Sequence, residues 1–482
     1  MTALLNKKQL LFGFFASLFI LSLTAAIYLK QYYFTAIPFT ILLLYSAWQH
    51  RDALFFLLLF SLPFSIEYHF SPTLGTDLPD EFLMLFVAGF FFLYWIYHPK
   101  TIPKQILQHP LLLLLFVSLV WIVITVLFST HHIVSIKYFL AKCWYIGAFV
   151  LAPLIVFRKR QNIRIAALTL ACSMLIVAII ALMRHSSNGF RFANINAAVS
   201  PFFRNHVNYS AMLVCILPIL FALYRLSNFR KQKIFISLAV IILLAALFFS
   251  YARGAWLALV AGIIAYWLIK KRYLLITCVT TFFIILASLF WLKNNDRYLQ
   301  FENDYNTTIF HKDFKEHLIA TYRLKDVSTA ERFYRWIAGV RMIKDNWLTG
   351  YGPNSFYDNY KGYAVPAFKT WVSKNEDHST VHNYFLLVAI EQGIPGLIFF
   401  LLLLGGMFYY AQYLYHRIQD IFCKTVSMTV GVILMMITVV NFLSDLVETD
   451  KIGSLFFLCL SVLSVIDINT RNKKDTQLAE VQ

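Results

Sequence analysis

Charged residues are scarce in this chain: 14% of its 482 residues are charged, whereas 60% are hydrophobic. Soluble globular domains carry roughly 25% charged residues, so the composition excludes that class. The apolar runs also lack the alternation of barrel strands. Many of them reach the roughly 17–25 residues that a membrane-spanning helix needs. The composition therefore predicts an all-α polytopic membrane protein.

Cysteine is also rare and follows no ligand pattern. Five of the six cysteines lie inside apolar runs, and Cys423 stands at the edge of one. None has the spacing of a zinc site or a plausible disulfide partner, so we expect small core residues. The outer Asp and Glu residues show no ligand cluster of metal spacing either. We therefore expect no metal and no cofactor.

The apolar runs give about 14 candidate spans. They cover residues 9–29, 33–48, 52–65, 82–98, 110–128, 137–157, 164–183, 208–225, 232–251, 254–270, 273–292, 395–415, 423–442 and 452–468. The second and third are short and could form one re-entrant feature, which leaves 12 spans as the alternative. The first run is too long for a signal peptide and lacks a cleavage site, so we expect a retained span.

The spans and one long hydrophilic stretch divide the chain into four regions. We expect N-terminal spans over 1–292, a periplasmic loop over 293–383, C-terminal spans over 384–470 and a cytoplasmic tail over 471–482. Basic residues gather on alternate connections, while the opposite connections, such as 67–81 and 444–450, are acidic. This pattern places both termini in the cytoplasm. Membrane lipids then account for much of the net charge of +18, and nucleic-acid binding is not expected.

Two outer connections are unusual. The shorter one, residues 184–207, carries Arg191 and Arg204, although positive charge on this side opposes the orientation rule. The longer one shows helical periodicity from Thr329 to Asp345. We expect an amphipathic helix there, packed on the membrane side over a cavity between the spans.

The apolar face expected for this helix carries Phe333, Trp336, Ile337, Val340 and Ile343. Two arginines of the same helix, Arg335 and Arg341, are expected to lie on its solvated face.

Arg253 lies between two spans on the outer side. An arginine at a membrane boundary is costly unless it pairs or faces water, and such residues often mark a substrate path. Its guanidinium group fits phosphate oxygens with two parallel hydrogen bonds. The alternative is an arginine that extends to the lipid headgroups.

Two histidines, His378 and His382, stand one helical turn apart where the long loop enters an apolar helix. Neutral imidazole can accept a proton near pH 7, so His382 is a candidate general base. Asn383 could orient His382 or cap the helix. For His378 three roles stay open: orienting His382, contacting an acceptor sugar, or lying on the surface.

These residues resemble the pattern of the bacterial O-antigen ligase family. That pattern contains an Arg-x-x-x-Leu element, an Arg-x-x-x-Trp loop with a Gly-x-Gly turn, and a His-Asn…Gly-x-x-Gly signature. The matching residues are Arg253 with Leu257, Arg332 with Trp336, Gly350-Tyr351-Gly352 with Phe356, His382-Asn383, and Gly393-Ile394-Pro395-Gly396. The likeness covers about Ser250 to Phe400; the N-terminal half is similar in topology and in its basic outer loop.

The resemblance implies a class C glycosyltransferase architecture without a metal, with its active site on the periplasmic face of the inner membrane. It implies transfer of a glycan from an undecaprenyl-diphosphate-linked donor to a lipid A-core acceptor. In this scheme His382 is the general base, and Arg253 and Arg332 bind the diphosphate. Arg204 and Arg191 are weaker candidates for the same charge. A single displacement of this kind would invert the anomeric carbon.

Other functions stay open. An O-antigen polymerase would use the same donor, and a protein O-oligosaccharyltransferase shares the histidine motif. A transporter of lipid-linked glycans is less favoured, because the sequence shows no symmetric halves and no acidic residues inside the spans for ion coupling.

Overall fold

The computed structural model describes residues 7–71, 74–294, 297, 327–366, 373 and 379–479. It divides into two compact units, residues 1–59 and 60–482, which are described separately. In the first unit, α1 (Lys7–Tyr28) and α2 (Ala36–Gln49) are joined by the 3-10 turn η1 (Tyr32–Thr35). At 14 residues, α2 is shorter than the roughly 20 residues of an ordinary span.

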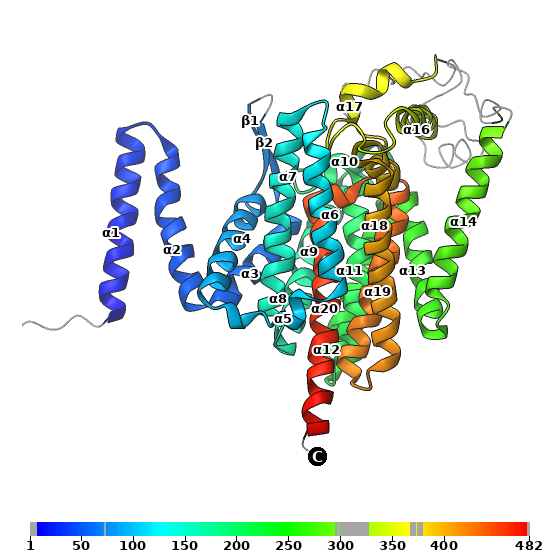
Figure 1. Ribbon diagram of the computed structural model, residues 1–482. Coiled ribbons are helices and arrows are strands. Elements are labelled where there is room, and N and C mark those ends of the chain that lie inside the picture. The colour runs from blue at the N-terminus through cyan, green and yellow to red at the C-terminus, as the bar shows by residue number, and fades with distance from the viewer. Residues whose placement is uncertain are drawn as a thin grey trace, which may run out of the picture. The chain divides into compact units, whose positions relative to one another are not determined.

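The second unit (Figure 1) is a helical bundle that contains the candidate site. Its long helices are α4 (Asp80–Tyr97), α6 (Pro110–Leu127), α7 (His132–Ile146), α9 (Arg160–Ser187), α11 (His206–Leu226), α12 (Arg230–Phe249), α13 (Arg253–Lys271), α14 (Leu274–Lys293), α16 (Val327–Asp345), α18 (Tyr384–Arg417), α19 (Ile421–Phe442) and α20 (Asp450–Ala479). Its shorter helices are α5 (Lys104–Leu107), α8 (Ala152–Val156), α10 (Ile195–Val199) and α17 (Phe356–Asn359), and α3 (Arg51–Ser61) precedes the bundle.

Short turns of other helix types complete the described elements. They are η2 (Leu62–Phe64), η3 (Pro99–Thr101), η4 (Gly147–Leu151), η5 (Phe192–Asn194), η7 (Tyr360–Tyr363) and η9 (Leu446–Glu448). The turn η4 joins α7 to α8 without a break, so that residues 132–156 form one continuous apolar segment.

Within the described residues, 12 helical segments are long and apolar enough to cross a membrane. The prediction of an all-α polytopic membrane protein is therefore confirmed. This count is the lower end of the predicted 12 to 14, because the second and third runs form the shorter helices α2 and α3, of 14 and 11 residues. The helix α18 also begins 11 residues before the predicted span at 395, because the mostly apolar stretch before Pro395 is already helical.

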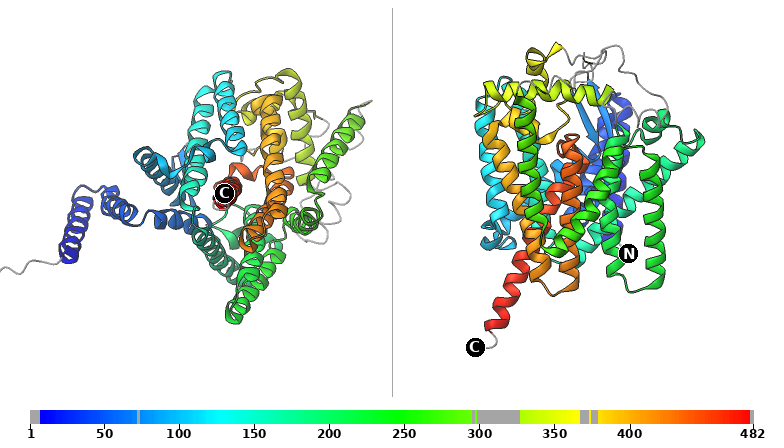
Figure 2. Two further views of the ribbon diagram at one scale, coloured as in Figure 1. Left: turned by 60° about the horizontal axis from the view of Figure 1, so that its bottom comes forward. Right: turned by 90° about the vertical axis from the view of Figure 1, so that its right-hand side faces the viewer.

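The centre of the bundle is α20, whose apolar window is almost entirely buried. In Figure 2 it stands in the middle of the second unit with other helices around it. By contrast, α14 lies at the edge of the bundle (Figure 1), and only 6% of its apolar window is buried, as expected of a lipid-facing helix.

A β-hairpin was not predicted. Strand β1 (Ile66–Ser71) pairs antiparallel with β2 (Leu74–Leu78), with Ile66 opposite Leu78. In the sequence these residues were assigned only to a short acidic connection. Figure 1 shows the hairpin at the same end of the bundle as α16 and α17.

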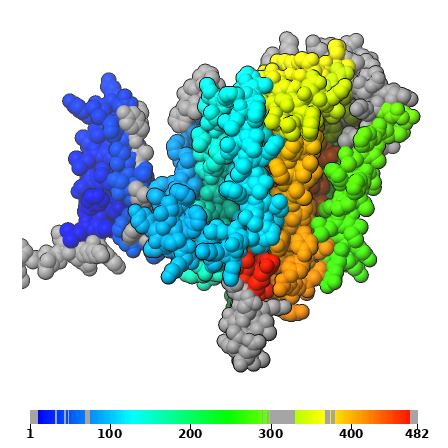
Figure 3. Space-filling view, in the orientation of Figure 1, coloured from blue at the N-terminus to red at the C-terminus, as the bar shows by residue number. Residues whose placement is uncertain are grey.

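The amphipathic helix predicted from Thr329 to Asp345 is present as α16, but a different face is buried. The buried apolar residues are Ala330, Tyr334, Ala338 and Met342, whereas Val340 is 51% exposed. The reason is that α16 packs on α18 and on the turn η7. In Figure 2 it lies across the ends of the spans, and in Figure 3 residues 327–366 cover the end of α18.

Candidate active site

The helix α18 is interrupted at Gly393, whose φ of 71° and ψ of 178° are not helical. The break leaves carbonyl groups before it without helical donors. Nearby segments supply them: Tyr351 N donates to Ile390 O at 3.0 Å and Gly352 N donates to Glu391 O at 2.9 Å. Trp121 Nε1 donates to Gln392 O at 2.8 Å. The Gly-x-Gly turn is thus bonded to the break in the helix.

Two signature glycines allow this close approach. A Cβ atom on Gly393 would lie 2.1 Å from Leu348 O, and one on Gly350 would lie 2.5 Å from Ile390 O. Both residues have positive φ, which favours glycine. Gly350 therefore serves the turn and its contact with α18, as expected from the sequence.

The carboxylate of Glu391 is 5% exposed inside α18. It accepts hydrogen bonds from Asn354 N at 2.8 Å and Phe356 N at 3.2 Å. The expectation that the spans hold no buried acidic residue is therefore wrong. Because this carboxylate is hydrogen-bonded to the loop after Gly352, it has a structural role in holding that loop against α18, and ion coupling is not needed to explain its burial.

The segment that carries His382 is held by α16. Arg335 Nη1 donates to Thr380 O at 2.9 Å, and Trp336 Nε1 donates to Val381 O at 3.0 Å. Arg335 is 5% exposed and pairs with Glu331 at 3.3 Å. Its predicted position on the solvated face is wrong, because the buried face of α16 includes these two charged residues. Arg341 is exposed as predicted.

The other side of the site is the turn after α19, residues 443–445. Arg332 Nε donates to Leu443 O at 3.3 Å, and Tyr384 N donates to Ser444 O at 3.0 Å. Gly254, next to Arg253, faces the Leu443 side chain, which would lie 3.5 Å from a Cβ atom at this glycine. The 443–445 turn therefore brings together α13, α16 and the start of α18.

Asp445 in this turn faces the candidate base. Its Oδ1 lies 4.0 Å from His382 Nδ1, and its Oδ2 accepts a hydrogen bond from Thr380 Oγ1 at 2.6 Å. Sequence reasoning missed Asp445. The acidic character of the 444–450 connection was available as a signal, but it was used only to assign the orientation of the spans.

His382 has a φ of 53°, in the left-handed region that residues with a side chain rarely adopt. Such strained conformations cluster at functional sites. The next residue, Asn383, accepts a hydrogen bond from Leu386 N at 3.0 Å and caps α18. Of the two roles proposed for Asn383, capping is the one seen.

Burial, together with the positive charges of Arg335 and Arg332, lowers the pKa of His382 to about 3. The imidazole is therefore neutral at physiological pH and can accept a proton. Burial also raises the pKa of Asp445 above its usual value. The site combines a neutral histidine, a carboxylate beside it and two arginines on one side.

Arg191 and Arg204 differ in position. Next to Arg191, Phe190 O accepts a hydrogen bond from Tyr251 Oη at 2.5 Å, so this loop contacts the turn before Arg253. Arg204 is exposed and follows the buried Phe203. No contact among the described residues ties Arg204 to the 443–445 turn. His378 lies outside the described residues.

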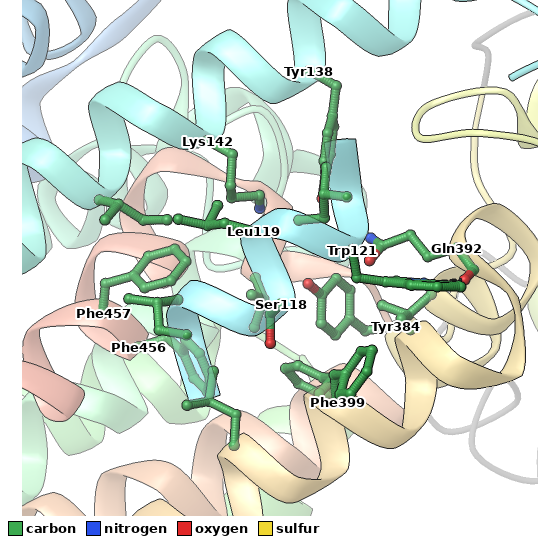
Figure 4. A pocket seen from close by; sticks show the side chains of 18 residues that line it. Ser118, Leu119, Trp121, Tyr138, Lys142, Tyr384, Gln392, Phe399, Phe456 and Phe457 are labelled. Atoms are coloured by element: carbon green, nitrogen blue, oxygen red, sulfur yellow. Dashed lines mark hydrogen bonds between the residues drawn. The ribbon is translucent and has the colours of Figure 1, made fainter. Parts of the chain in front are cut away.

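A small cavity of about 50 Å³ lies among α6, α7, α18 and α20, beside Tyr384 (Figure 4). Its polar wall includes Lys142, which pairs with Glu448 at 3.0 Å. Tyr138 Oη also donates to Glu448 at 2.9 Å. Sequence reasoning missed these residues too, although a lysine inside an apolar span is itself a signal of function.

Comparisons with known proteins point to one family. Residues 238–401 match the family model described as O-antigen ligase. The chain is also 25% identical over 221 residues to an O-antigen ligase of Salmonella typhimurium. The aligned region covers 44% of this chain and 48% of the relative. The match thus spans about half of that relative's length. Arg253, Arg332 and His382 fall inside residues 238–401, whereas Asp445 lies beyond them.

Proposed function

We propose that the chain, whose residues 238–401 match the family model described as O-antigen ligase, is a membrane glycosyltransferase of the ligase type. It would move a glycan from undecaprenyl diphosphate to the lipid A-core acceptor. The observation that supports this proposal is the placement of a neutral His382 beside Asp445, with the charges of Arg335 and Arg332 acting on it. A base and cationic groups at one site are the two components that this reaction needs.

In the proposed reaction His382 takes the proton of the acceptor hydroxyl. The Nδ1 atom faces Asp445, so Nε2 is the nitrogen left to accept the proton. The Asp445 carboxylate then stabilises the imidazolium that forms, as carboxylates do beside catalytic histidines. The acceptor oxygen bonds to the anomeric carbon while the bond from that carbon to the diphosphate breaks. Because attack and departure occur on opposite faces, the product is inverted.

The leaving diphosphate needs positive charge, which Arg253 and Arg332 would supply. Guanidinium groups bind phosphate oxygens bidentately and keep their charge. Arg191, on the loop that contacts the turn before Arg253, is a further candidate for this charge, and Arg204 a weaker one. In this proposal the arginines do the work that a metal ion does in other transferases.

Donor binding would also strengthen the base. In the protein without donor, the charges of Arg335 and Arg332 contribute to the low pKa of His382. A bound diphosphate brings negative charge to the same arginines and offsets that effect. The pKa of His382 would then rise towards the range in which histidine acts as a base. The protein would thus activate its base only when the donor is present.

The site would lie on the periplasmic face. The basic connections predict that the loop carrying α16 is outside and both termini are inside the cell. Figure 1 places α16, α17 and the β-hairpin at one end of the bundle, which supports a single outer surface. The ligase reading implies that this surface meets both the lipid-linked donor and the lipid A-core acceptor.

The histidine variant tests the chemistry. His382→Ala should lower transfer by roughly 10²–10⁴-fold, with membrane insertion and donor binding retained, because the proton moves only in the reaction. His131→Ala is a matched control, since His131 is an outer histidine with a side chain 45% exposed. Transfer at the wild-type rate by inserted His382→Ala protein would remove His382 from the mechanism.

A glycolipid gel from a knockout strain tests the ligase assignment. Loss of a ligase leaves unsubstituted lipopolysaccharide core together with lipid-linked polymer. Loss of an O-antigen polymerase instead leaves core that carries single repeat units, and this result would replace the ligase proposal with the polymerase.

A further inference from the structure

Three carboxylates from two distant parts of the sequence meet at one point of the second unit. Asp77 lies in β2, Asp80 is the first residue of α4, and Asp450 is the first residue of α20. One oxygen atom from each lies within 4.8 Å of the others. The sequence predicted no ligand cluster of metal spacing on the outer side, and this expectation is wrong because the fold joins residues that are far apart in the chain.

The nearest positive charge does not balance this cluster. Lys451 interacts electrostatically with all three carboxylates. Its Nζ also donates to Ser65 O at 3.2 Å and to Phe202 O, and it lies 4.1 Å from the centre of the Phe203 ring. One ammonium group thus faces three carboxyl groups, which repel one another unless they share protons or bind a cation.

An oxygen of Asp80 points independently to a ligand. Asp80 is 0% exposed. Its Oδ1 accepts a hydrogen bond from Glu81 N at 3.0 Å, but its Oδ2 accepts none from any described residue. The neighbouring hydroxyl of Ser65 donates to Leu62 O at 3.2 Å and also lies close to the Asp80 carboxylate. A buried carboxylate oxygen without a donor is unfavourable unless a cation satisfies it.

We propose that Asp77, Asp80 and Asp450 bind one hard divalent cation, with Ca²⁺ as the best fit. All three ligands are oxygen atoms, which select hard cations over zinc or copper. Three carboxylates favour Ca²⁺, because Mg²⁺ usually keeps several waters and takes only one or two carboxylates. The three oxygen atoms lie within 4.8 Å of one another, as ligands of one cation must.

The position of this cation gives it a structural role. It would fasten the β-hairpin and the start of α4 to the start of α20. The residues just before α20 are the 443–445 turn and η9, which carry Asp445 and Glu448. The cation would therefore fix one end of the connection that carries Asp445, and it takes no part in the transfer chemistry.

The experiment uses the full-length protein in detergent, freed of ions by chelator and dialysis. Addition of Ca²⁺ should raise Tm by roughly 2–5 °C, because an ion that binds the folded state stabilises it. Elemental analysis after removal of free ion should find about one Ca²⁺ per chain, and Mg²⁺ should give a smaller shift. Asp80→Asn should lose both the ion and the shift. Asp345→Asn, which removes an exposed carboxylate on the same outer side, should keep both.

Two results would overturn the proposal. The first is wild-type protein that holds no Ca²⁺ and shows no shift in Tm, which would mean that Lys451 and a shared proton neutralise the carboxylates. The second is Asp80→Asn protein that binds Ca²⁺ as the wild type does. Neither measurement uses a glycan donor, so the outcome is independent of the proposed transferase activity. Since Asp80→Asn removes one of several like charges, the ion-free variant should fold.

Discussion

Replacing Asp445 with asparagine tests whether this residue assists His382. The substitution keeps the size of the side chain and an oxygen that can accept the hydrogen bond of Thr380. It removes the negative charge 4.0 Å from His382 Nδ1. The charge matters only when His382 has taken a proton, so its loss should affect the reaction more than donor binding.

The size of the effect follows from the geometry. Two unit charges 4.0 Å apart interact by about 4 kcal/mol at an effective dielectric constant of about 20. The side chains of His382 and Asp445 are 36% and 19% exposed, so solvent screening reduces this to about 1–2 kcal/mol. Asp445→Asn should therefore lower kcat roughly 5- to 30-fold.

The same substitution should also shift the pH dependence of kcat in a definite direction. A general base works in its unprotonated form, and loss of the carboxylate lowers the pKa of His382 in the donor complex by about one unit. The acidic limb of the kcat profile should therefore move to lower pH by about one unit, while the plateau falls because the base is weaker.

The assay is transfer between purified lipid-linked donor and lipid acceptor in proteoliposomes, with kcat measured against pH. Asp358→Asn is the matched control, because Asp358 also faces a histidine, His131, at 3.6 Å, and both of these side chains are more than 40% exposed. It should leave rate and profile unchanged. An Asp445→Asn protein with the wild-type rate and the wild-type profile would refute the pairing of Asp445 with His382.

Three further predictions follow from the site. Arg253→Lys keeps the charge but loses the bidentate guanidinium, so it should retain at most a small fraction of the wild-type transfer rate. The wild-type protein should stay active in excess chelator at temperatures below its Tm. Wild-type activity that is lost in chelator and returns only with added Mg²⁺ would contradict this scheme. Gly393→Ala places a Cβ atom 2.1 Å from Leu348 O at a residue with positive φ, so it should lower the free energy of unfolding by about 2–4 kcal/mol. The control Gly405→Ala, whose Cβ atom would meet nothing within 4 Å, should change the free energy of unfolding little. Alkaline phosphatase fused near Asp345 should be active and a fusion after Lys233 inactive; the opposite pair would reverse the assigned orientation.

Much of the membrane fold was predictable because lipid constrains each span by itself. Length and hydrophobicity of a segment decide whether it can cross, and these are local properties. The exceptions were segments whose structure depends on distant partners. The hairpin of β1 and β2 was missed, and the buried face of α16 was assigned to lipid-facing apolar residues. In α16 the partner is α18, whose Ile390 side chain packs against Gly339, while Val340 stays exposed.

The site was predictable only in part for the same reason. His382, Arg253 and Arg332 could be found because they lie in recognisable local patterns. Asp445 could not, since its role depends on a turn more than 60 residues away in the chain that folds back against Thr380. Arg335 looked solvated because its ion pair with Glu331 is buried only when α16 packs against the segment before α18.

The spacing of the His-Asn…Gly-x-x-Gly signature has a structural explanation. Asn383 caps the start of α18, and Gly393 ends its first regular stretch. The helix between them rises about 1.5 Å and turns about 100° per residue, so each added residue would displace and rotate one end against the other. The start is fixed to the 443–445 turn by Tyr384 N, and the break is fixed to the loop after α16 by Ile394 N, which donates to Trp347 O at 2.7 Å. Because α16 holds both the His382 segment and this loop, the nine intervening residues set the distance between the candidate base and the arginine-bearing helix. A change in this spacing would misplace His382 even if every side chain of the site were kept.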